Sequence, residues 1–336
     1  MTRPKDRPAT LADVAALAGV SQMTVSRVIN GAAYVSEQRR SDVQRAIEQT
    51  GYISHQAARS LVTRRTNSIA FVVAESQHQF FTDPVFGAMV LGANERLSAD
   101  DLQLVTIVCT TPADRVRVSR YIRAGHVDGA LLASFRRDDP LLGEVSRAGI
   151  PTVMAGRPLR SVRIPYVDVN NRKGAREITQ YLLDAGCRRI GTIAGPLQMS
   201  SGRHRLDGFR DAVGDLLAPQ CIAQGDFSRE SGHQAMLELL QQAPDLDAVF
   251  AANDAMAAGA IAALQAAGRR IPGDVRVAGF DDSSIATETR PQLTTVHQPL
   301  TEIGRRMAQL LIRRITTGES VRSALLPTSL VLRESA

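Results

Sequence analysis

The feature that most constrains this chain is a long alternation of short apolar runs with segments of helical periodicity, which begins after residue 66. Strands are predicted at 69–74, 102–108, 127–133, 152–155, 189–194, 247–252, 275–279 and 294–297. Amphipathic helices are predicted between most of them, as at 85–97, 172–185, 206–217, 232–242 and 255–267. This alternation favours parallel sheets with helices on both faces. Ligands of such sheets bind beyond the carboxyl ends of the strands.

Hydrogen-bonding side chains follow several of these predicted strands. Asn253-Asp254, Asp281-Asp282 and Gln298 each follow one, and Arg205 is expected to open the helix after Gly195-Pro196. Such groups suit a polyhydroxylated ligand, because each hydroxyl can donate to a carboxylate and accept from an arginine or amide. Each residue alone also fits a helix cap or a surface group. Asn253-Asp254 in particular is a good N-cap pair.

Several chemistries lack their motifs in this sequence. The chain contains no G-x-G pair, no Walker A loop, no H-E-x-x-H and no G-x-S-x-G. Its six histidines are scattered, and its three cysteines, Cys109, Cys187 and Cys221, lie far apart without C-x-x-C spacing. We therefore expect no catalytic site, no cofactor and no metal. No apolar run approaches the roughly 20 residues that span a bilayer, so we expect no membrane segment.

The first sixty residues follow a different pattern, that of three short helices. Thr10 can cap the first helix and Gly19 can end it with a left-handed turn. Ser21 can cap a second helix, Gln22–Ile29, so that two helices joined by a tight turn form a helix-turn-helix. A third helix is predicted from the cap at 36 to about 50. On pattern alone, other small helical bundles look similar.

The second helix and the charge distribution both indicate DNA binding. Gln22, Met23, Ser26 and Arg27 face outward, and these residue types suit base edges and phosphates, since Gln pairs with adenine and Arg with guanine. Residues 1–66 carry ten Lys/Arg against five Asp/Glu, a surplus of five. The formal net charge is +6, which leaves a surplus of only one for the other residues. A basic head on a near-neutral body is typical of a polyanion-binding module.

The run from Thr10 to Asn30, TLADVAALAGVSQMTVSRVIN, resembles the signature of the lactose-repressor (LacI/GalR) family, and Val35-Ser36, Gly51-Tyr52 and Ala57–Leu61 continue it. The resemblance implies that Gln22, Met23 and Arg27 enter the major groove of DNA. The residues that would hold phosphates or orient this helix are Ser21, Thr24, Ser26 and Asn30. Residues 54–62, with Ala58 and Leu61, are similar to the family's hinge helix. Leu61 would be its minor-groove wedge; a plain linker leucine is the alternative.

The resemblance continues through the remainder of the chain. The motifs that carry it are 194–197, 205–209, 225–227, 252–257, 279–282 and 293–298. They imply the fold of periplasmic sugar-binding proteins, two subdomains with the effector in the cleft. The residues that would contact the effector are Arg205, Asn253, Asp281 and Gln298, the aromatic platform Phe227, and Asp83 and Phe86 on the edge of the first subdomain.

One position departs from the family pattern. Several relatives place an aspartate where this chain has Gly156-Arg157, and the opening could admit a larger ligand such as a disaccharide. The departure also puts in doubt the transfer of any particular effector. The chain has no Trp, so Phe227, with Phe81 or Phe86, is left as the stacking side chain for a sugar.

We thus expect an all-α helix-turn-helix headpiece and an α/β core of two doubly wound parallel-sheet subdomains. The expected boundaries are 1–52 for the headpiece, 53–66 for hinge and linker, and 67–336 for the core, with a first subdomain at about 67–167 and 298–327 and a second at about 168–297 and 328–336.

The expected function is that of a cytoplasmic homodimeric repressor, released from a palindromic operator DNA by a small sugar. A tetramer is not expected, because the chain ends without a leucine heptad. Three alternatives stay open: a corepressor or non-sugar effector, a solute-binding protein, and an enzyme. The basic head argues against the second, and the missing motifs argue against the third.

Overall fold

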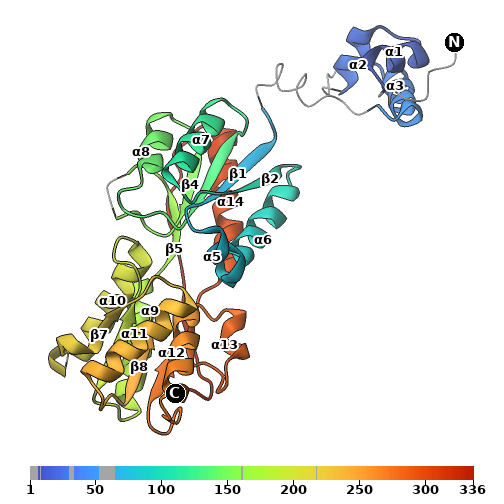
Figure 1. Cartoon of the computed structure of the whole chain (residues 1–336). Coiled ribbons are helices and arrows are strands. Elements are labelled where there is room, and N and C mark those ends of the chain that lie inside the picture. Colours follow the sequence, from blue (N-terminus) through green and yellow to red (C-terminus); the bar gives the residue numbers. More distant parts are fainter. Residues whose placement is uncertain (1–6, 8, 30–33, 53–64, 160–161, 217) are drawn as a thin grey trace. The chain divides into compact units, whose positions relative to one another are not determined.

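A computed structural model describes residues 7, 9–29, 34–52, 65–159, 162–216 and 218–336 (Figure 1). The chain forms two compact units, Met1–Thr66 and Asn67–Ala336. Most of the expected hinge and linker segment, residues 53–64, lies outside the described residues. Within the described residues, no helix is both long and apolar enough to cross a membrane.

The first unit contains the three predicted helices, α1 (Leu11–Ala18), α2 (Gln22–Ile29) and α3 (Glu37–Thr50). Thr10 forms a capping box with Asp13, and the left-handed Gly19 ends α1 at φ +64°, as the sequence predicts. The amide of Thr24 donates to the Ser21 hydroxyl at 3.2 Å, so Ser21 caps α2. The inward faces of the helices meet in one small core formed by Val14, Ala15, Val25, Val28, Val43 and Ala46.

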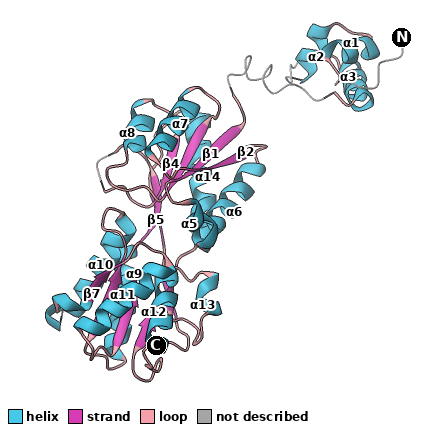
Figure 2. Cartoon of the chain, viewed as in Figure 1, coloured by secondary structure: helices cyan, strands magenta, loops and turns pink. Residues whose placement is uncertain are grey.

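The second unit is built from short strands connected by helices (Figure 2). The strands are β1 (Ser68–Val73), β2 (Gln103–Val108), β3 (Gly129–Ala133), β4 (Thr152–Ala155), β5 (Tyr166–Val169), β6 (Ile190–Ala194), β7 (Ile222–Gln224), β8 (Ala248–Ala251), β9 (Arg276–Ala278), β10 (Thr295–His297), β11 (Ala324–Leu326) and β12 (Ser329–Val331). The α-helices are α5 (Gln77–Thr82), α6 (Pro84–Ser98), α7 (Pro112–Arg123), α8 (Pro140–Arg147), α9 (Asn171–Asp184), α10 (Ser200–Val213), α11 (Arg229–Gln242), α12 (Asp254–Ala266), α13 (Ser284–Glu288) and α14 (Leu300–Thr317). Two 3₁₀ turns, Gly214–Leu216 and Pro219–Cys221, precede β7.

Two parallel sheets organise this unit. The larger has the strand order β11-β5-β4-β3-β1-β2, and the smaller has the order β7-β6-β8-β9. Neighbouring residues of the large sheet enter different cores: Phe71 and Leu131 pack in one apolar cluster, and Ala70 and Leu132 in another. Because successive side chains of a strand point to opposite faces, helices cover both faces of the sheet.

The chain crosses three times between the two sheets, and we use the sheets to define a first and a second subdomain. The first crossing follows β5, the second follows β10, and the third lies between β11 and β12. Helix α14, red in Figure 1, therefore returns to the first subdomain and packs against α6. The sheet assignment keeps residues up to Val169 in the first subdomain, two residues beyond the boundary suggested by the sequence.

Helices α6 and α14 approach each other at two reciprocal glycines. A Cβ at Gly92 would lie 1.8 Å from the carbonyl oxygen of Thr301, and a Cβ at Gly304 would lie 1.9 Å from that of Met89. Each glycine thus receives the backbone of the other helix, and no side chain fits between them. This contact fixes how the returning helix is held in the first subdomain.

The structure confirms all eight predicted strands with ends that differ by at most two residues, but it corrects two details. The strand 294–297 pairs antiparallel with β12 and touches the second sheet only through isolated bridges, so it is not an ordinary member of a parallel sheet. The helix predicted at 206–217 runs from Ser200 to Val213 and is capped by Gly214, so both of its predicted ends were wrong. Its first turn, SSGR, carries no apolar periodicity, and Arg205 therefore lies in the second turn and does not open the helix.

Candidate effector cavity and DNA-binding surface

The second helix of the first unit presents an open face. Its buried residues are Val25 and Val28, whereas Gln22, Met23 and Arg27 are exposed, Met23 with 63% of its surface. Exposed long side chains on a helix that is anchored by two valines can reach a groove without disturbing the core.

The smaller residues of the expected DNA surface lie beside this face. Ser21 is exposed, and Thr24 and Ser26 are half-buried. The hydroxyls of Ser21 and Thr24 lie 3.0 Å apart, so both stabilise the start of α2. The other three expected DNA contacts, Asn30, Ala58 and Leu61, lie outside the described residues.

In the second unit, one cavity gathers all seven residues that the sequence suggests for the effector. It has a volume of about 130 Å³, and both subdomains contribute to its lining. Five of the seven come from helix caps or from turns that follow strands: Asp83 is the N-cap of α6, Asn253 is the N-cap of α12, and Phe227, Asp281 and Gln298 follow β7, β9 and β10. Arg205 and Phe86 come from helices α10 and α6.

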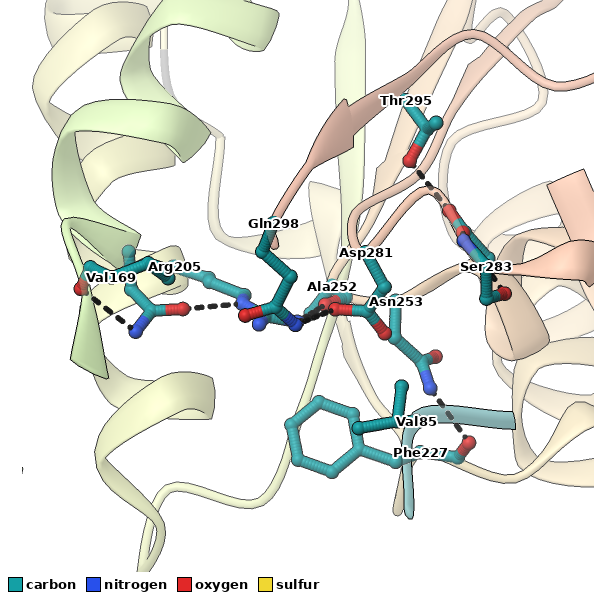
Figure 3. A network of polar contacts seen from close by, with 12 residues as sticks. Val85, Val169, Arg205, Phe227, Ala252, Asn253, Asp281, Ser283, Thr295 and Gln298 are labelled. Carbon is teal, nitrogen blue, oxygen red and sulfur yellow. Dashed lines mark hydrogen bonds and ion pairs between the residues drawn. The ribbon is translucent and has the colours of Figure 1, made fainter. Parts of the chain in front are cut away.

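A buried arginine organises the second-subdomain side of the cavity (Figure 3). Arg205 is only 4% exposed. Its Nε donates to the Asn171 side-chain oxygen at 2.8 Å, and its Nη1 donates to the Ala252 carbonyl at 2.6 Å and to Asp281 Oδ1 at 3.0 Å. The guanidinium carbon also lies 3.7 Å from the centre of the Phe280 ring. The planar fork is therefore held on its edges and on its face.

Asp281 is the acidic centre of this network. Gln298 Nε2 donates to Asp281 Oδ1 at 2.6 Å, which adds a second donor to the one from Arg205. The backbone at Asp281 has φ +118°, a strained conformation that is common at functional sites. Burial raises the pKa of the Asp281 carboxyl to about 6, although Arg205 acts to lower it. Burial and the nearby Asp281 also raise the pKa of Asp254 well above its ordinary value.

Phe227 forms an aromatic wall next to this network. A Cβ at Gly195 would lie 2.4 Å from the Phe227 ring, so the ring rests directly on the glycine backbone, as expected for a strand end that must allow a close approach. The Asn253 amide donates to the Phe227 carbonyl at 3.0 Å (Figure 3). The Asn253 side-chain oxygen accepts from the Met256 amide at 2.9 Å. Asn253 is thus both a helix cap and a support for the aromatic residue.

The first subdomain contributes an acidic group with open acceptor capacity. Asp83 Oδ1 accepts from the Val85 amide at 3.0 Å and caps α6, and no described hydrogen bond uses its Oδ2. Burial, and less strongly the charge of Asp281, raise the pKa of Asp83 to about 7. Phe86, 5% exposed, completes the apolar floor on this side.

Sequence reasoning missed six polar lining residues, and two of them, Asp168 and Asn171, belong to the Arg205 network. Asp168 Oδ2 accepts from the Arg157 amide at 2.9 Å, and its Oδ1 accepts from the Val169 amide at 2.8 Å and the Asn171 amide group at 2.9 Å. Since the Asn171 side-chain oxygen also accepts a hydrogen bond from Arg205, Asp168 and Asn171 connect the first crossing of the chain to the cavity. The short apolar alternation YVDV followed by two asparagines was the available signal.

Of the two residues that depart from the family pattern, Gly156 and Arg157, only Gly156 lines the cavity. Gly156, with φ +81°, lines it, but the Arg157 side chain turns away and donates from Nε to the Tyr166 hydroxyl at 3.0 Å. Phe81 is 80% exposed and is not among the lining residues, so of the three aromatic candidates Phe227 and Phe86 face the cavity.

Comparison with known proteins places both units in one class, the regulatory proteins of bacteria. The family described as bacterial regulatory proteins, lacI family, matches residues 10–55, and the periplasmic binding protein-like domain matches residues 179–336. The HTH-type transcriptional regulator CelR of Thermobifida fusca is 47% identical over 336 residues, which cover 98% of both chains. The chain therefore belongs to the lacI family, and the predicted two-part fold is confirmed.

Two solved structures resemble the whole chain. The transcriptional regulator CelR in complex with cellobiose has a TM-score of 0.79 at 44% identity and covers 98% of this chain and 100% of its own. The lac repressor dimer bound to operator and the anti-inducer ONPF has a TM-score of 0.86 at 28% identity and covers 98% of this chain and 99% of its own.

Proposed function

We propose that this protein is a cytoplasmic, homodimeric repressor that binds a palindromic operator and releases it when a disaccharide such as cellobiose occupies the cavity. The observation that carries the proposal is the convergence of Arg205, Asn253, Asp281 and Gln298 with two phenylalanines around one cavity. Planar polar groups beside an aromatic ring suit sugar hydroxyls and the apolar faces of sugar rings. The similarity to a regulator solved with cellobiose supports the choice of sugar.

On the DNA side, the exposed face of α2 supports a reading role. Gln22, Met23 and Arg27 would contact base edges, and Ser21, Thr24, Ser26 and Asn30 would contact phosphates or orient the helix. The two-fold symmetry of a dimer matches the two half-sites of a palindrome. A linker at 53–66, with Ala58 and the wedge Leu61, would occupy the minor groove between the half-sites.

The coupling between cavity and DNA would run through the crossings of the chain. A sugar that contacts both Asp83 on the first subdomain and Asp281 on the second would change the angle between the two subdomains. In a dimer this change would move the two linkers relative to each other and weaken their hold on the operator. Coupling free energies of this kind are typically about 1–3 kcal/mol, which is roughly a 5- to 150-fold change in affinity.

The test is a fluorescence-anisotropy titration of the purified protein against an operator fragment selected from genomic DNA. Cellobiose is expected to weaken binding by at least about fivefold. The variant Asp281→Asn, which keeps a residue tolerant of the left-handed backbone, should bind the operator normally but lose the response. If cellobiose tightened binding, the protein would be a corepressor-dependent regulator; if no sugar changed it, the cavity would not hold the effector. If the wild-type protein bound no DNA fragment specifically, the proposed DNA binding would be refuted.

A further inference from the structure

The cavity described above carries an excess of negative charge. Among the described residues that line it, the charged ones are three carboxylates and one guanidinium, namely Asp83, Asp168, Asp281 and Arg205. A fourth acid, Glu75, lies behind the lining and accepts from the Ser134 hydroxyl at 2.6 Å. The excess is notable because the chain as a whole carries a formal charge of +6.

The guanidinium is already committed to protein partners. Arg205 donates to Asn171, to the Ala252 carbonyl and to Asp281, and Asp281 and Arg205 form the buried ion pair of the cavity at 3.0 Å. A negatively charged ligand would therefore have to compete with Asp281 for the same cation. Such competition is costly, because separating a buried pair leaves one charge without its partner.

The three carboxylates differ in how fully they are satisfied. Asp168 receives three donors, from Arg157, Val169 and Asn171. Asp281 receives two donors, from Arg205 and Gln298, and both bonds use Oδ1. Asp83 receives one described donor, the Val85 amide, and that bond uses only Oδ1. Asp83 is therefore the carboxylate with the most acceptor capacity left for a ligand.

We propose that the cavity selects uncharged sugars and rejects their anionic derivatives, with Asp83 as the residue that discriminates. A neutral sugar hydroxyl donates to Asp83 and gains a charge-assisted hydrogen bond. A phosphate or carboxylate at the same place has no proton to donate and lies close to a like charge in a water-poor site. This inference rests on the proposed function and refines it.

The selectivity has a consequence for where the regulator acts in metabolism. A sugar that must be uncharged has to reach the protein before any reaction that phosphorylates it or oxidises it to an acid. The reaction that supplies the effector is therefore uptake or release of the free sugar, and phosphorylation or oxidation removes the signal.

The experiment is isothermal titration calorimetry of the full chain at about pH 8, which is above the pKa of about 7 that burial gives to Asp83. The probes are cellobiose, cellobionate and cellobiose 6′-phosphate, whose charges lie at opposite ends of the disaccharide. The wild type is expected to bind both anions at least about tenfold more weakly than cellobiose. In Asp83→Asn the ratio of the two dissociation constants, anion over cellobiose, should fall by at least about tenfold for one of the two anions.

A control variant separates a local effect from a general change of charge. Glu230 lies on the wall of the outer hollow that shares Asp83 and Phe227 with the cavity, so Glu230→Gln removes the same charge farther out and should leave the ratio unchanged. Wild-type binding of either anion within threefold of cellobiose would overturn the selection. An equal fall in the ratio of the dissociation constants in Glu230→Gln would overturn the role of Asp83. If none of the three probes bound, the proposed sugar effector itself would be rejected, and this inference with it.

Discussion

Replacing Arg205 with lysine keeps a positive charge in the cavity but removes the planar fork that holds its network together. A single ammonium group can stay paired with Asp281, yet it cannot also reach Asn171 on the opposite edge of the fork. The lost Nε–Asn171 bond, 2.8 Å long, is a hydrogen bond from a charged group and contributes roughly 1.5–3 kcal/mol. Weaker stacking on Phe280 removes about a further 0.5–2 kcal/mol.

The expected loss for Arg205→Lys is therefore about 2–5 kcal/mol in the free energy of unfolding of the second unit. For a unit of this size, about 1 kcal/mol corresponds to roughly 2–4 °C in Tm, so Tm should fall by about 4–20 °C. The chain contains no Trp, and far-UV circular dichroism is the suitable probe for thermal and urea unfolding.

Arg172→Lys is the matched control. Arg172 also makes a two-pronged pair, with Asp211 at 2.5 and 2.7 Å, but its side chain is 60% exposed. Exposed pairs contribute little, so this variant should lose less than about 1 kcal/mol. Equal stability losses in the two variants, or an Arg205→Lys protein as stable as the wild type, would refute the claim. The claim is that burial and planar geometry make the Arg205 network contribute strongly to the free energy of unfolding. Arg205→Lys should also lose its response to cellobiose while it still binds the operator.

Three further predictions concern packing, pH and DNA. Gly304→Ala should lower the free energy of unfolding by about 1–3 kcal/mol, because the added Cβ would collide with the Met89 carbonyl oxygen. The control Gly87→Ala on α6, where nothing lies within 4 Å of the added Cβ, should raise the free energy of unfolding by about 0.5–1 kcal/mol. Similar urea midpoints for the two variants would contradict the close helix contact. Asp83 faces the charged groups Glu75, Asp281 and Arg205, and its pKa is raised from 3.8 to about 7. Its contribution to the free energy of unfolding is therefore fully present below about pH 4 and is lost as the pH rises through 7. Asp83→Asn should therefore gain stability relative to the wild type between about pH 4 and 8, and parallel Tm–pH profiles would argue against a buried acid. Arg27→Ala should weaken binding to the preferred operator by about 1–3 kcal/mol in a gel-shift assay and affect an unrelated duplex much less; equal losses on both would exclude a base contact.

Much of the candidate site could be predicted from the sequence, because its residues follow strands. Asn253, Asp281 and Gln298 follow the ends of β8, β9 and β10 by one to three residues, and the parallel strands β8 and β9 bring their carboxyl ends to one edge. Asp168 and Asn171 escaped prediction because the polar Asp168 interrupts the apolar run of β5, so no strand was predicted there. Arg205 was found, although its place in the helix was wrong, because a polar first turn hides the start of α10.

The sequence by itself determined the local features of this protein. The capping box at Thr10, the left-handed Gly19 and the apolar face of α2 depend on residues a few positions apart, and such short-range interactions can be read directly from the order of residues. The alternation of strands and helices likewise fixed the class of fold.

Only the tertiary structure decided how distant segments meet. That α14 returns to pack on α6, that Asn171 joins Asp168 to Arg205, and that Asp83 faces the same cavity as Asp281 all depend on contacts between residues far apart in the chain. These contacts form because the chain passes three times between the two subdomains and brings distant segments together where they pack. Because burial in that cavity, and not the residue type, sets the charge state of each acid, its electrostatic character follows from the fold.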